Sequence, residues 1–261
     1  MTLSPQEAIA RERRWARNVA VVTFIAALLV LVSLFIEGGG LIEGDTDAER
    51  LRSLDDKSGA LLVVSIARAI GLAMLSIPLL YLFRAAQARS DAVRGPLIGF
   101  CFIGPILFGI QSIVGWAAST EIASDFVQAP AMGDAAEKLA DDLIEDSSLR
   151  QAAAGLLLPA LLGLVIGMVY IPLQAMRTGL LTRFWATLGM ALGAALIIVP
   201  LVPLIGLMMW FVFLGLVIVD RWPGERPRAW EAGRAIPWPK PGEEEDEPEP
   251  EPGPRAGPPD A

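Results

Sequence analysis

The sequence predicts an all-α protein, a polytopic bundle of six transmembrane helices that is followed by a disordered cytoplasmic tail. Three observations support this fold class. Hydrophobic residues make up 54% of the 261 residues and are gathered in long runs, whereas a soluble domain would disperse them. Basic and acidic segments alternate between these runs. The end of the chain has the composition of a segment that does not fold.

Six apolar segments are candidates for transmembrane helices, each of which needs roughly 20 apolar residues. The last two form one apolar block, which is too long for a single span at about 1.5 Å per residue. Pro200 and Pro203 lie near the middle of this block, where a tight turn would divide it. The predicted spans are residues 18–36, 59–83, 96–119, 151–173, 184–200 and 203–219.

The charges between the spans predict the orientation. Residues 37–58 carry seven acidic against three basic residues, and residues 118–150 carry eight against two. The remaining flanks are rich in arginine, namely residues 1–17, 84–95, 174–184 and 220–241. By the positive-inside rule both termini are cytoplasmic, which requires an even number of spans. Abundant Ala, Gly and Arg are typical of a GC-rich bacterium, so we expect a protein of the bacterial cytoplasmic membrane, with the lipid bilayer as its main partner.

Short helices are expected in both acidic loops. In the first loop, Asp45 or Thr46 can cap a helix with Leu51 and Leu54 on one face. In the second, an acidic amphipathic helix is predicted, with its apolar face formed by Met132, Ala136, Leu139 and Leu143. We interpret its acidic side as a solvated surface and not as a cation site, because the spacing matches no EF-hand loop.

The end of the chain divides into two parts. Residues 220–241 place three tryptophans among arginines, and they are predicted to lie on the inner leaflet with arginine on anionic lipid. A protein partner is the competing interpretation of this segment. Residues 242–261 consist almost wholly of Glu, Asp, Pro, Gly and Ala, and we expect them to be disordered.

Tryptophans near the predicted membrane boundaries are expected to lie at the lipid headgroups. The predicted anchors are Trp15, Trp116, Trp185, Trp222, Trp230 and Trp238. Trp210 falls near the middle of the last predicted span and is expected to pack in the protein interior. Two pairs of glycines, Gly163 with Gly167 and Gly189 with Gly193, have the spacing that allows close helix packing.

The inventory of reactive side chains excludes most enzyme classes. The chain has no histidine, its one cysteine is Cys101 in an apolar run, and no acidic residue lies inside a predicted span. A Ser–His dyad, a histidine-ligated zinc and a buried carboxylate pair are therefore excluded. No P-loop or dinucleotide fingerprint is present. We expect no enzyme, no cofactor, no catalytic metal and no nucleic-acid partner.

Arg68 is the basic residue that interrupts the apolar run "VSIARAIGLAM". One interpretation is that its long side chain extends to the outer membrane boundary, because side chains on a helix lean toward its N-terminus. The other is a polar cluster at similar depth. In that cluster Arg68 would bond Gln111 or the Gly155 carbonyl and pair with Glu121 or an acid of the outer loops, and Ser112 would lie beside it.

Two stretches, "LSIPLLYLFRAAQARSDAVRGPLIGFCFIGPILFGIQSIVGWA" and "DRWPGERPRAWEAGRAIPWP", resemble uncharacterised multi-pass membrane proteins of high-GC actinobacteria. The resemblance covers about half of the chain. It implies a membrane localisation and carries no functional residue to this sequence.

Two functions remain open from the sequence. The first is a non-enzymatic envelope scaffold, partner or sensor, which would bind a membrane protein or a second copy of itself. The second is a small transporter or channel with an anion-favouring polar centre around Arg68. A polar pore would favour the second function, and a tightly packed bundle would favour the first.

Overall fold

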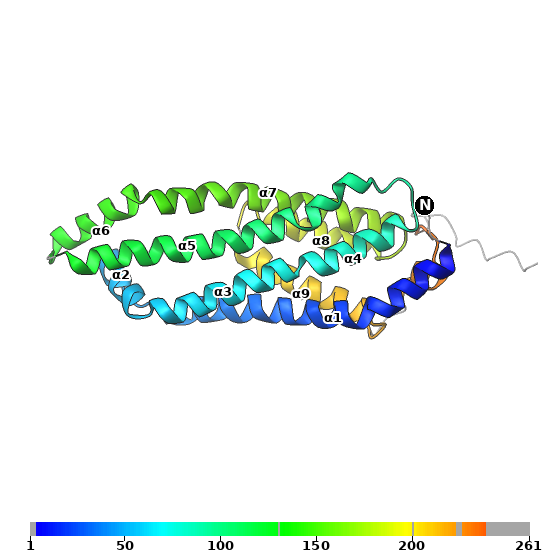
Figure 1. Ribbon diagram of the computed structural model, residues 1–261, viewed down its shortest axis with the longest axis horizontal. Helices are drawn as coiled ribbons and strands as arrows, with labels where there is room; N and C mark the ends of the chain where they lie inside the picture. Colours follow the sequence, from blue (N-terminus) through cyan, green and yellow to red (C-terminus); the bar gives the residue numbers. More distant parts are fainter. Residues whose placement is uncertain (1–3, 130, 200, 223–225, 239–261) are drawn as a thin grey trace, which may run out of the picture.

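The computed structural model describes residues 4–129, 131–199, 201–222 and 226–238. These residues are all-helical and contain no strand. The long helices follow one axis, so that the molecule is an elongated bundle (Figure 1). The segment predicted to be disordered, residues 242–261, lies outside the described residues.

The helices follow one another with short connections. Their bounds are α1 Pro5–Ile36, η1 Glu37–Leu41, α2 Asp47–Asp56, α3 Ser58–Met74, α4 Ser76–Gln87, η2 Gly95–Cys101, α5 Ile103–Gln128, α6 Asp134–Asp146, α7 Ser148–Arg177, α8 Arg183–Ala195, α9 Leu201–Ile218 and α10 Ala229–Ala232. In Figure 1, α2 and α6 lie at one end of the bundle, and α8 and α9 lie along its other half.

Four helical segments in the described part of the chain are long and apolar enough to cross a membrane. They contain the first four predicted spans, so the chain is an α-helical membrane protein. Their bounds are Pro5–Leu41, Ser58–Gln87, Gly95–Gln128 and Ser148–Arg177. The last two predicted spans, 184–200 and 203–219, correspond to the shorter helices α8 and α9, which form a hairpin.

Prolines explain where the long helices are interrupted. Pro78 has no N–H to donate to the carbonyl of Met74, and α3 ends at Met74, just before α4 begins. Pro105 lies in the first turn of α5, directly after η2. Helix α7 continues through its own two prolines, Pro159 and Pro172.

Glycines bring neighbouring helices into direct backbone contact. A Cβ atom on Gly163 would lie 2.9 Å from the backbone nitrogen of Gly104 in α5. One on Gly167 would lie 2.8 Å from the carbonyl oxygen of Phe100 in η2. The prediction that this glycine pair allows close packing is therefore confirmed.

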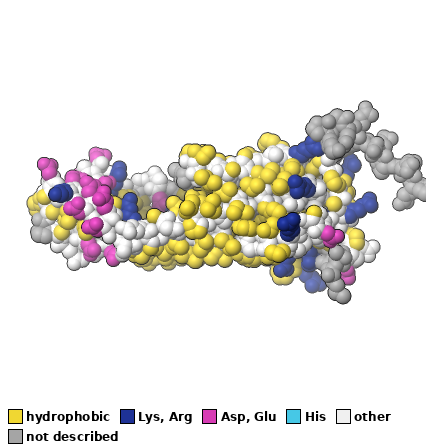
Figure 2. Space-filling model, turned by 90° about the horizontal axis from the view of Figure 1, so that it is seen from above, with side chains coloured by type: hydrophobic (Ala, Val, Ile, Leu, Met, Phe, Trp, Pro, Cys, Tyr) yellow, Lys and Arg dark blue, Asp and Glu magenta, His cyan; other side chains and the backbone are white. Residues whose placement is uncertain are grey.

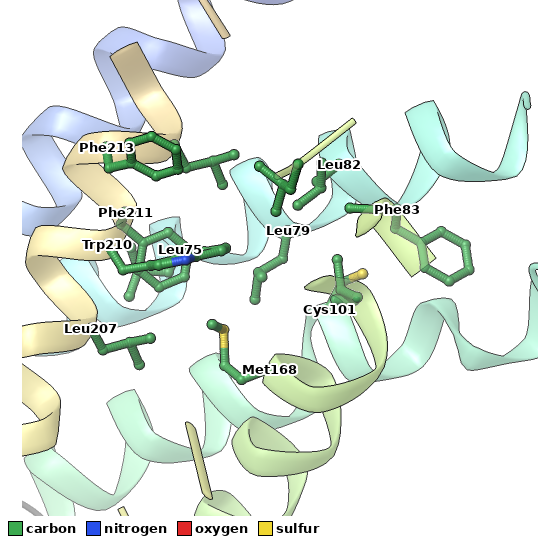
Figure 3. Close-up of a cluster of buried hydrophobic side chains, with 14 of the residues drawn as sticks. Leu75, Leu79, Leu82, Phe83, Cys101, Met168, Leu207, Trp210, Phe211 and Phe213 are labelled. Atoms are coloured by element: carbon green, nitrogen blue, oxygen red, sulfur yellow. The ribbon is translucent and has the colours of Figure 1, made fainter. Parts of the chain in front are cut away.

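A continuous apolar core fills the half of the bundle that contains α4, α8 and α9. Leu75, Leu79, Leu207, Trp210 and Phe211 are all at most 1% exposed and fill the space between α3, α4, α7 and α9 (Figure 3). The prediction that Trp210 packs in the interior is confirmed, and its Nε1 donates to the carbonyl of Trp185 at 2.8 Å.

A second, smaller core lies under α2, α6 and the last turns of α5. Thr46 caps α2, and Leu51 is buried in this core as predicted. Ala136 is also buried, but Met132 is 87% exposed, because α6 begins only at Asp134. Three of the four predicted apolar positions of the second outer helix therefore face protein, and the prediction for Met132 is wrong.

Charged side chains gather at the two ends of the molecule, and an apolar belt lies between them (Figure 2). We call the end formed by α2 and α6 the acidic end. The opposite end, which holds the start of α1, the α4–η2 and α7–α8 connections and residues 226–238, is called the basic end.

Candidate functional site

Arg68 lies on α3 near the acidic edge of the apolar belt. Three residues further along α3, a Cβ atom on Gly71 would lie 2.9 Å from the carbonyl oxygen of Ala26, which fixes the register of α3 against α1. From Ala26, the apolar part of α1 continues to Ile36, the last residue of the helix. Glu37, the first residue of η1, follows directly. The Arg68 side chain leans toward the start of α3 and so reaches Glu37.

Two polar contacts hold the Arg68 guanidinium. Its Nη1 forms an ion pair with Glu37, and its Nε donates to Ser112 Oγ at 2.8 Å. The side chains are only partly exposed, 18% for Arg68 and 29% for Glu37. Charged hydrogen bonds of this kind are stronger where water is partly excluded.

The structure brings together only part of the predicted cluster. The predicted acid from an outer loop is Glu37, the first acidic residue after the first apolar run. Gln111 lies beside the group, but the hydrogen bond from Arg68 goes to Ser112. Glu121 and Gly155 are both exposed and do not join the cluster, so these two predictions are wrong. Gly155 lies on α7, whereas the contacts of Arg68 come from α5 and from η1, which directly follows α1.

The Arg68 group borders an open pocket of about 220 Å³. Its lining includes Ser65, Gln111 and Trp116, and the Nε1 of Trp116 donates to the carbonyl of Ser58 at 3.1 Å. Glu37 and Arg68 are the charged side chains among the lining residues. The two opposite charges are paired with each other within this lining.

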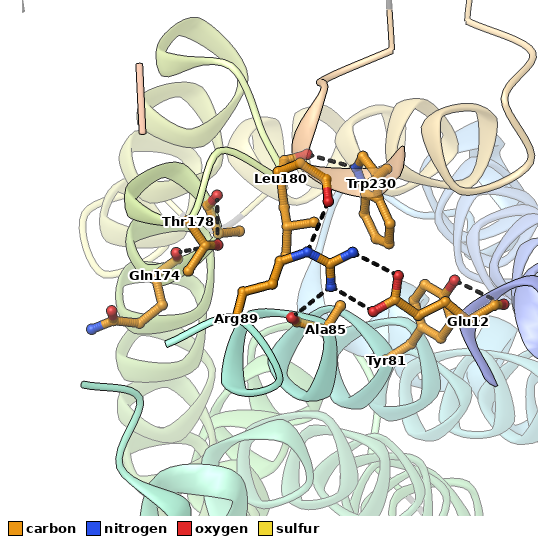
Figure 4. Close-up of polar contacts among 10 residues, drawn as sticks. Glu12, Tyr81, Ala85, Arg89, Gln174, Thr178, Leu180 and Trp230 are labelled. Atoms are coloured by element: carbon orange, nitrogen blue, oxygen red, sulfur yellow. Dashed lines mark hydrogen bonds and ion pairs between the residues drawn. The ribbon is translucent and has the colours of Figure 1, made fainter. Parts of the chain in front are cut away.

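A second ion pair lies at the basic end and is almost completely buried. Arg89 binds the Glu12 carboxylate through both terminal nitrogens, at 2.5 and 2.8 Å, and these side chains are 0% and 7% exposed (Figure 4). The guanidinium also donates to the carbonyls of Ala85 and Ala229, at 2.9 and 3.0 Å. The pair therefore joins α1, the end of α4 and the C-terminal part of the chain.

Residues 226–238, called the C-terminal segment below, fold back against the basic end. The Nε1 atoms of Trp230 and Trp238 donate to the carbonyls of Leu180 and Leu181, at 2.9 and 2.8 Å. The backbone of Ile236 donates to the carbonyl of Thr178. The segment is thus held by the α7–α8 connection and, through Ala229, by Arg89.

The predicted tryptophan anchors occupy different environments. Trp15 is 55% exposed, in accord with a position at the membrane surface. Trp116 and Trp238 are half-buried and bonded to backbone carbonyls. Trp230 is 3% exposed, so its ring contacts protein in place of lipid headgroups and the prediction for it is wrong.

Trp185 and Trp222 form an aromatic group with Phe213. The ring centroids of Trp185 and Phe213 are 3.6 Å apart and stacked, and Trp222 meets both rings edge-on. The sequence predicted that both tryptophans lie at the membrane boundary, but it did not predict their contact with each other. The contact joins the start of α8 to the residues that follow α9, which are distant in the sequence.

Reactive groups in the part of the chain that the structure describes include side chains of the metal-ligating types and the cysteine thiol. No three His, Cys, Asp or Glu side chains among them are placed to hold a metal ion. Cys101, the free thiol, is 0% exposed in the apolar core. The polar arrangements of this part of the chain are therefore ion pairs and helix-to-loop contacts.

No family model, no curated protein and no solved structure matches the chain. The resemblance to actinobacterial membrane proteins therefore stays a prediction. The functional interpretation depends on the geometry described above.

Proposed function

We propose that the chain is a six-span protein of the bacterial cytoplasmic membrane, with both termini in the cytoplasm, that acts as a non-enzymatic scaffold or partner protein. The observation that carries the proposal is the packed centre of the bundle. Leu72 and Leu79, Leu75 at the α3–α4 junction, and Trp210 and Phe211 on α9 belong to one buried cluster, and each is at most 1% exposed. A centre filled by buried apolar side chains favours a packed bundle over a polar pore.

The hairpin of α8 and α9 supports a count of six spans. Helix α9 has 18 residues and is therefore about 27 Å long, close to the thickness of a hydrocarbon core. It packs along α1, where a Cβ atom on Gly215 would meet the ring of Phe24. The tip of the hairpin is strongly apolar, and Ile198 there is 83% exposed.

The charge distribution supports the orientation. Arginines cluster at the basic end and carboxylates at the acidic end, and the positive-inside rule therefore favours a cytoplasmic basic end. The acidic end, with its own small core under α2 and α6, then projects outside the membrane. An exposed, folded and acidic platform of this kind is suited to contact with another protein.

The alternative, a small anion transporter, is favoured only by the pocket beside Arg68. The pairing of Arg68 with Glu37 counts against it, because the positive charge is already neutralised. The full chain should be reconstituted in phosphatidylcholine vesicles that contain a chloride-sensitive dye. We expect no chloride flux above that of empty vesicles. A flux that Arg68→Leu abolishes would reject the scaffold proposal in favour of transport.

Contact with a partner can be tested in living cells with a photo-crosslinking amino acid. It should be placed at Asp141, Asp142 or Glu145 on the exposed side of α6 and, as a control, at Ile166, which is 42% exposed on the apolar belt. We expect a discrete crosslinked product from α6 that is absent from Ile166. Two tagged copies of the chain show whether the product is a homo-oligomer. Absence of a discrete product from all three α6 positions contradicts the proposal.

A further inference from the structure

A groove of about 730 Å³ opens at the basic end, between the start of α1 and the end of α9. Its lining combines charged and apolar side chains, and we call the charged lining residues the rim and the apolar ones the floor. The floor is formed by Ala20, Val21 and Phe24 on α1, together with Leu216 on α9. The rim holds four arginines and two acidic residues, namely Arg13, Arg17, Arg221, Arg226, Glu12 and Asp220.

The positive charge of the rim is not cancelled. Both oxygens of the Glu12 carboxylate accept hydrogen bonds from Arg89, which comes from outside the groove. Asp220 forms an ion pair with Arg226, in which its Oδ1 lies 4.0 Å from the Nε of the arginine. Arg13, Arg17 and Arg221 are exposed on the rim, so the groove carries a net positive charge that an anion would offset.

Arg226, in the lining of the groove, has one donor that makes no hydrogen bond within the described residues. Its Nη2 donates to the carbonyl of Ile218 at 3.1 Å, and its guanidinium lies 5.2 Å from the ring centroid of Trp230. Its Nε is buried without a hydrogen-bond acceptor among the described residues. A buried donor of this kind is costly to leave unpaired, and an oxygen of a bound anion would satisfy it.

The rim lies at the level where the apolar helices meet the polar end. Arg17 lies two residues before Val19, where the apolar run of α1 begins, and Arg221 lies three residues after Ile218, the last residue of α9. Val21 on the floor is 48% exposed, so the floor offers contact to a hydrocarbon chain. A soluble phosphate would use only the rim, whereas a phospholipid would use both parts.

We propose that this groove binds one anionic phospholipid from the leaflet at the basic end. The phosphodiester lies between the arginines of the rim, and an acyl chain runs along the floor between α1 and α9. The sequence prediction placed anionic lipid on residues 220–241. The groove uses Arg221 and Arg226 of that segment but adds the arginines of α1.

The test is native mass spectrometry of the full chain in detergent, with dioleoylphosphatidylglycerol as the probe and dioleoylphosphatidylcholine as the neutral comparison. We expect one phosphatidylglycerol molecule to bind at least tenfold more tightly than phosphatidylcholine. The double variant Arg17→Gln/Arg221→Gln should lose most of this preference. The matched control Arg14→Gln/Arg177→Gln removes the same charge at exposed arginines outside the groove and should keep it.

A second variant separates lipid from soluble anion and leaves the charges intact. Val21→Trp fills the floor from a half-exposed position, where the change does not disturb the core. We expect it to reduce phosphatidylglycerol binding at least fivefold, with the elution volume of the protein unchanged. The proposal is overturned if both double variants lose binding equally, if Val21→Trp has no effect, or if millimolar inorganic phosphate displaces the lipid.

Discussion

At the scale of single residues, Arg68 shows how a charged side chain is accommodated at the edge of an apolar belt. An arginine at the centre of a span costs roughly 3 kcal/mol on insertion scales. The structure reduces this cost in two ways, because the side chain leans toward the acidic end and meets both Glu37 and Ser112 there. Of the two interpretations from sequence, the polar cluster is found in part, with Ser112 and Glu37 as the partners of Arg68. Extension of the side chain to the membrane boundary stays a prediction.

Replacing Arg68 should destabilise the protein by an amount that depends on which contact is lost. We expect Arg68→Leu to lower the free energy of unfolding by about 1–3 kcal/mol, because the partly buried Glu37 is left unpaired. Arg68→Lys keeps the charge but loses the Nε hydrogen bond to Ser112, so its cost should be about half. Thermal unfolding in detergent measures both. Equal stability of Arg68→Leu and the unchanged protein would show that the contacts contribute nothing.

The pair of Arg89 and Glu12 was missed because its partners are 77 residues apart in the sequence. In the sequence both are ordinary members of a charged flank. Only the fold shows that Arg89 is fully buried and satisfied by one carboxylate and two carbonyls. No local pattern identifies a buried charge whose partner comes from a distant segment.

Neutralising Glu12 should leave the Arg89 charge buried without its counter-ion. We expect Glu12→Gln to destabilise the protein by about 3–5 kcal/mol and to loosen the C-terminal segment, which Arg89 holds through Ala229. Trypsin cleavage after Arg228 and Arg234 should therefore become faster. The control is Glu121→Gln, the same change at an exposed position on α5. Similar cleavage rates for the two variants would contradict a role for the pair in holding the segment.

At the scale of helices, the elements with local signals were predicted and those with distant partners were not. The first four spans have long apolar runs, and α2 and most of α6 have clear amphipathic spacing. The C-terminal segment was expected to lie on lipid, because its tryptophans and arginines fit a membrane surface. Its actual contacts, such as Trp230 with Leu180, join residues 50 apart and depend on the α7–α8 connection.

Helix contact through glycine makes a prediction with an internal control. Gly163→Ala places a Cβ atom 2.9 Å from the backbone of Gly104, so α5 and α7 must separate, at a cost of about 1–3 kcal/mol. Gly155→Ala lies on the same helix with nothing within 4 Å of the new Cβ, and it should be neutral or stabilise by up to about 1 kcal/mol. Thermal unfolding in detergent compares the two. If both variants lose equal stability, close helix contact at Gly163 is not important.

At the scale of the whole molecule, charge and packing divide the bundle into three zones. The acidic end has its own small core, the middle is a filled apolar core, and the basic end is tied together by the Arg89 pair and the C-terminal segment. The sequence predicted the zones, because segregated charge and apolar runs are visible along the chain. The contacts that hold the basic end together were not predicted, because they join segments that are distant in the sequence.

The number of spans decides on which side of the membrane the C-terminal segment lies. Single cysteines should be placed at Glu49, Lys138, Asp91 and Glu231, all exposed, in a Cys101→Ala background. With six spans, an impermeant maleimide added to intact cells should label positions 49 and 138, at the acidic end, and should leave 91 and 231 unlabelled until the membrane is opened. If α8 and α9 together cross the membrane only once, position 231 lies outside. Labelling at 231 in intact cells would then reject six spans, while the labels at 49, 138 and 91 would still report the first four crossings.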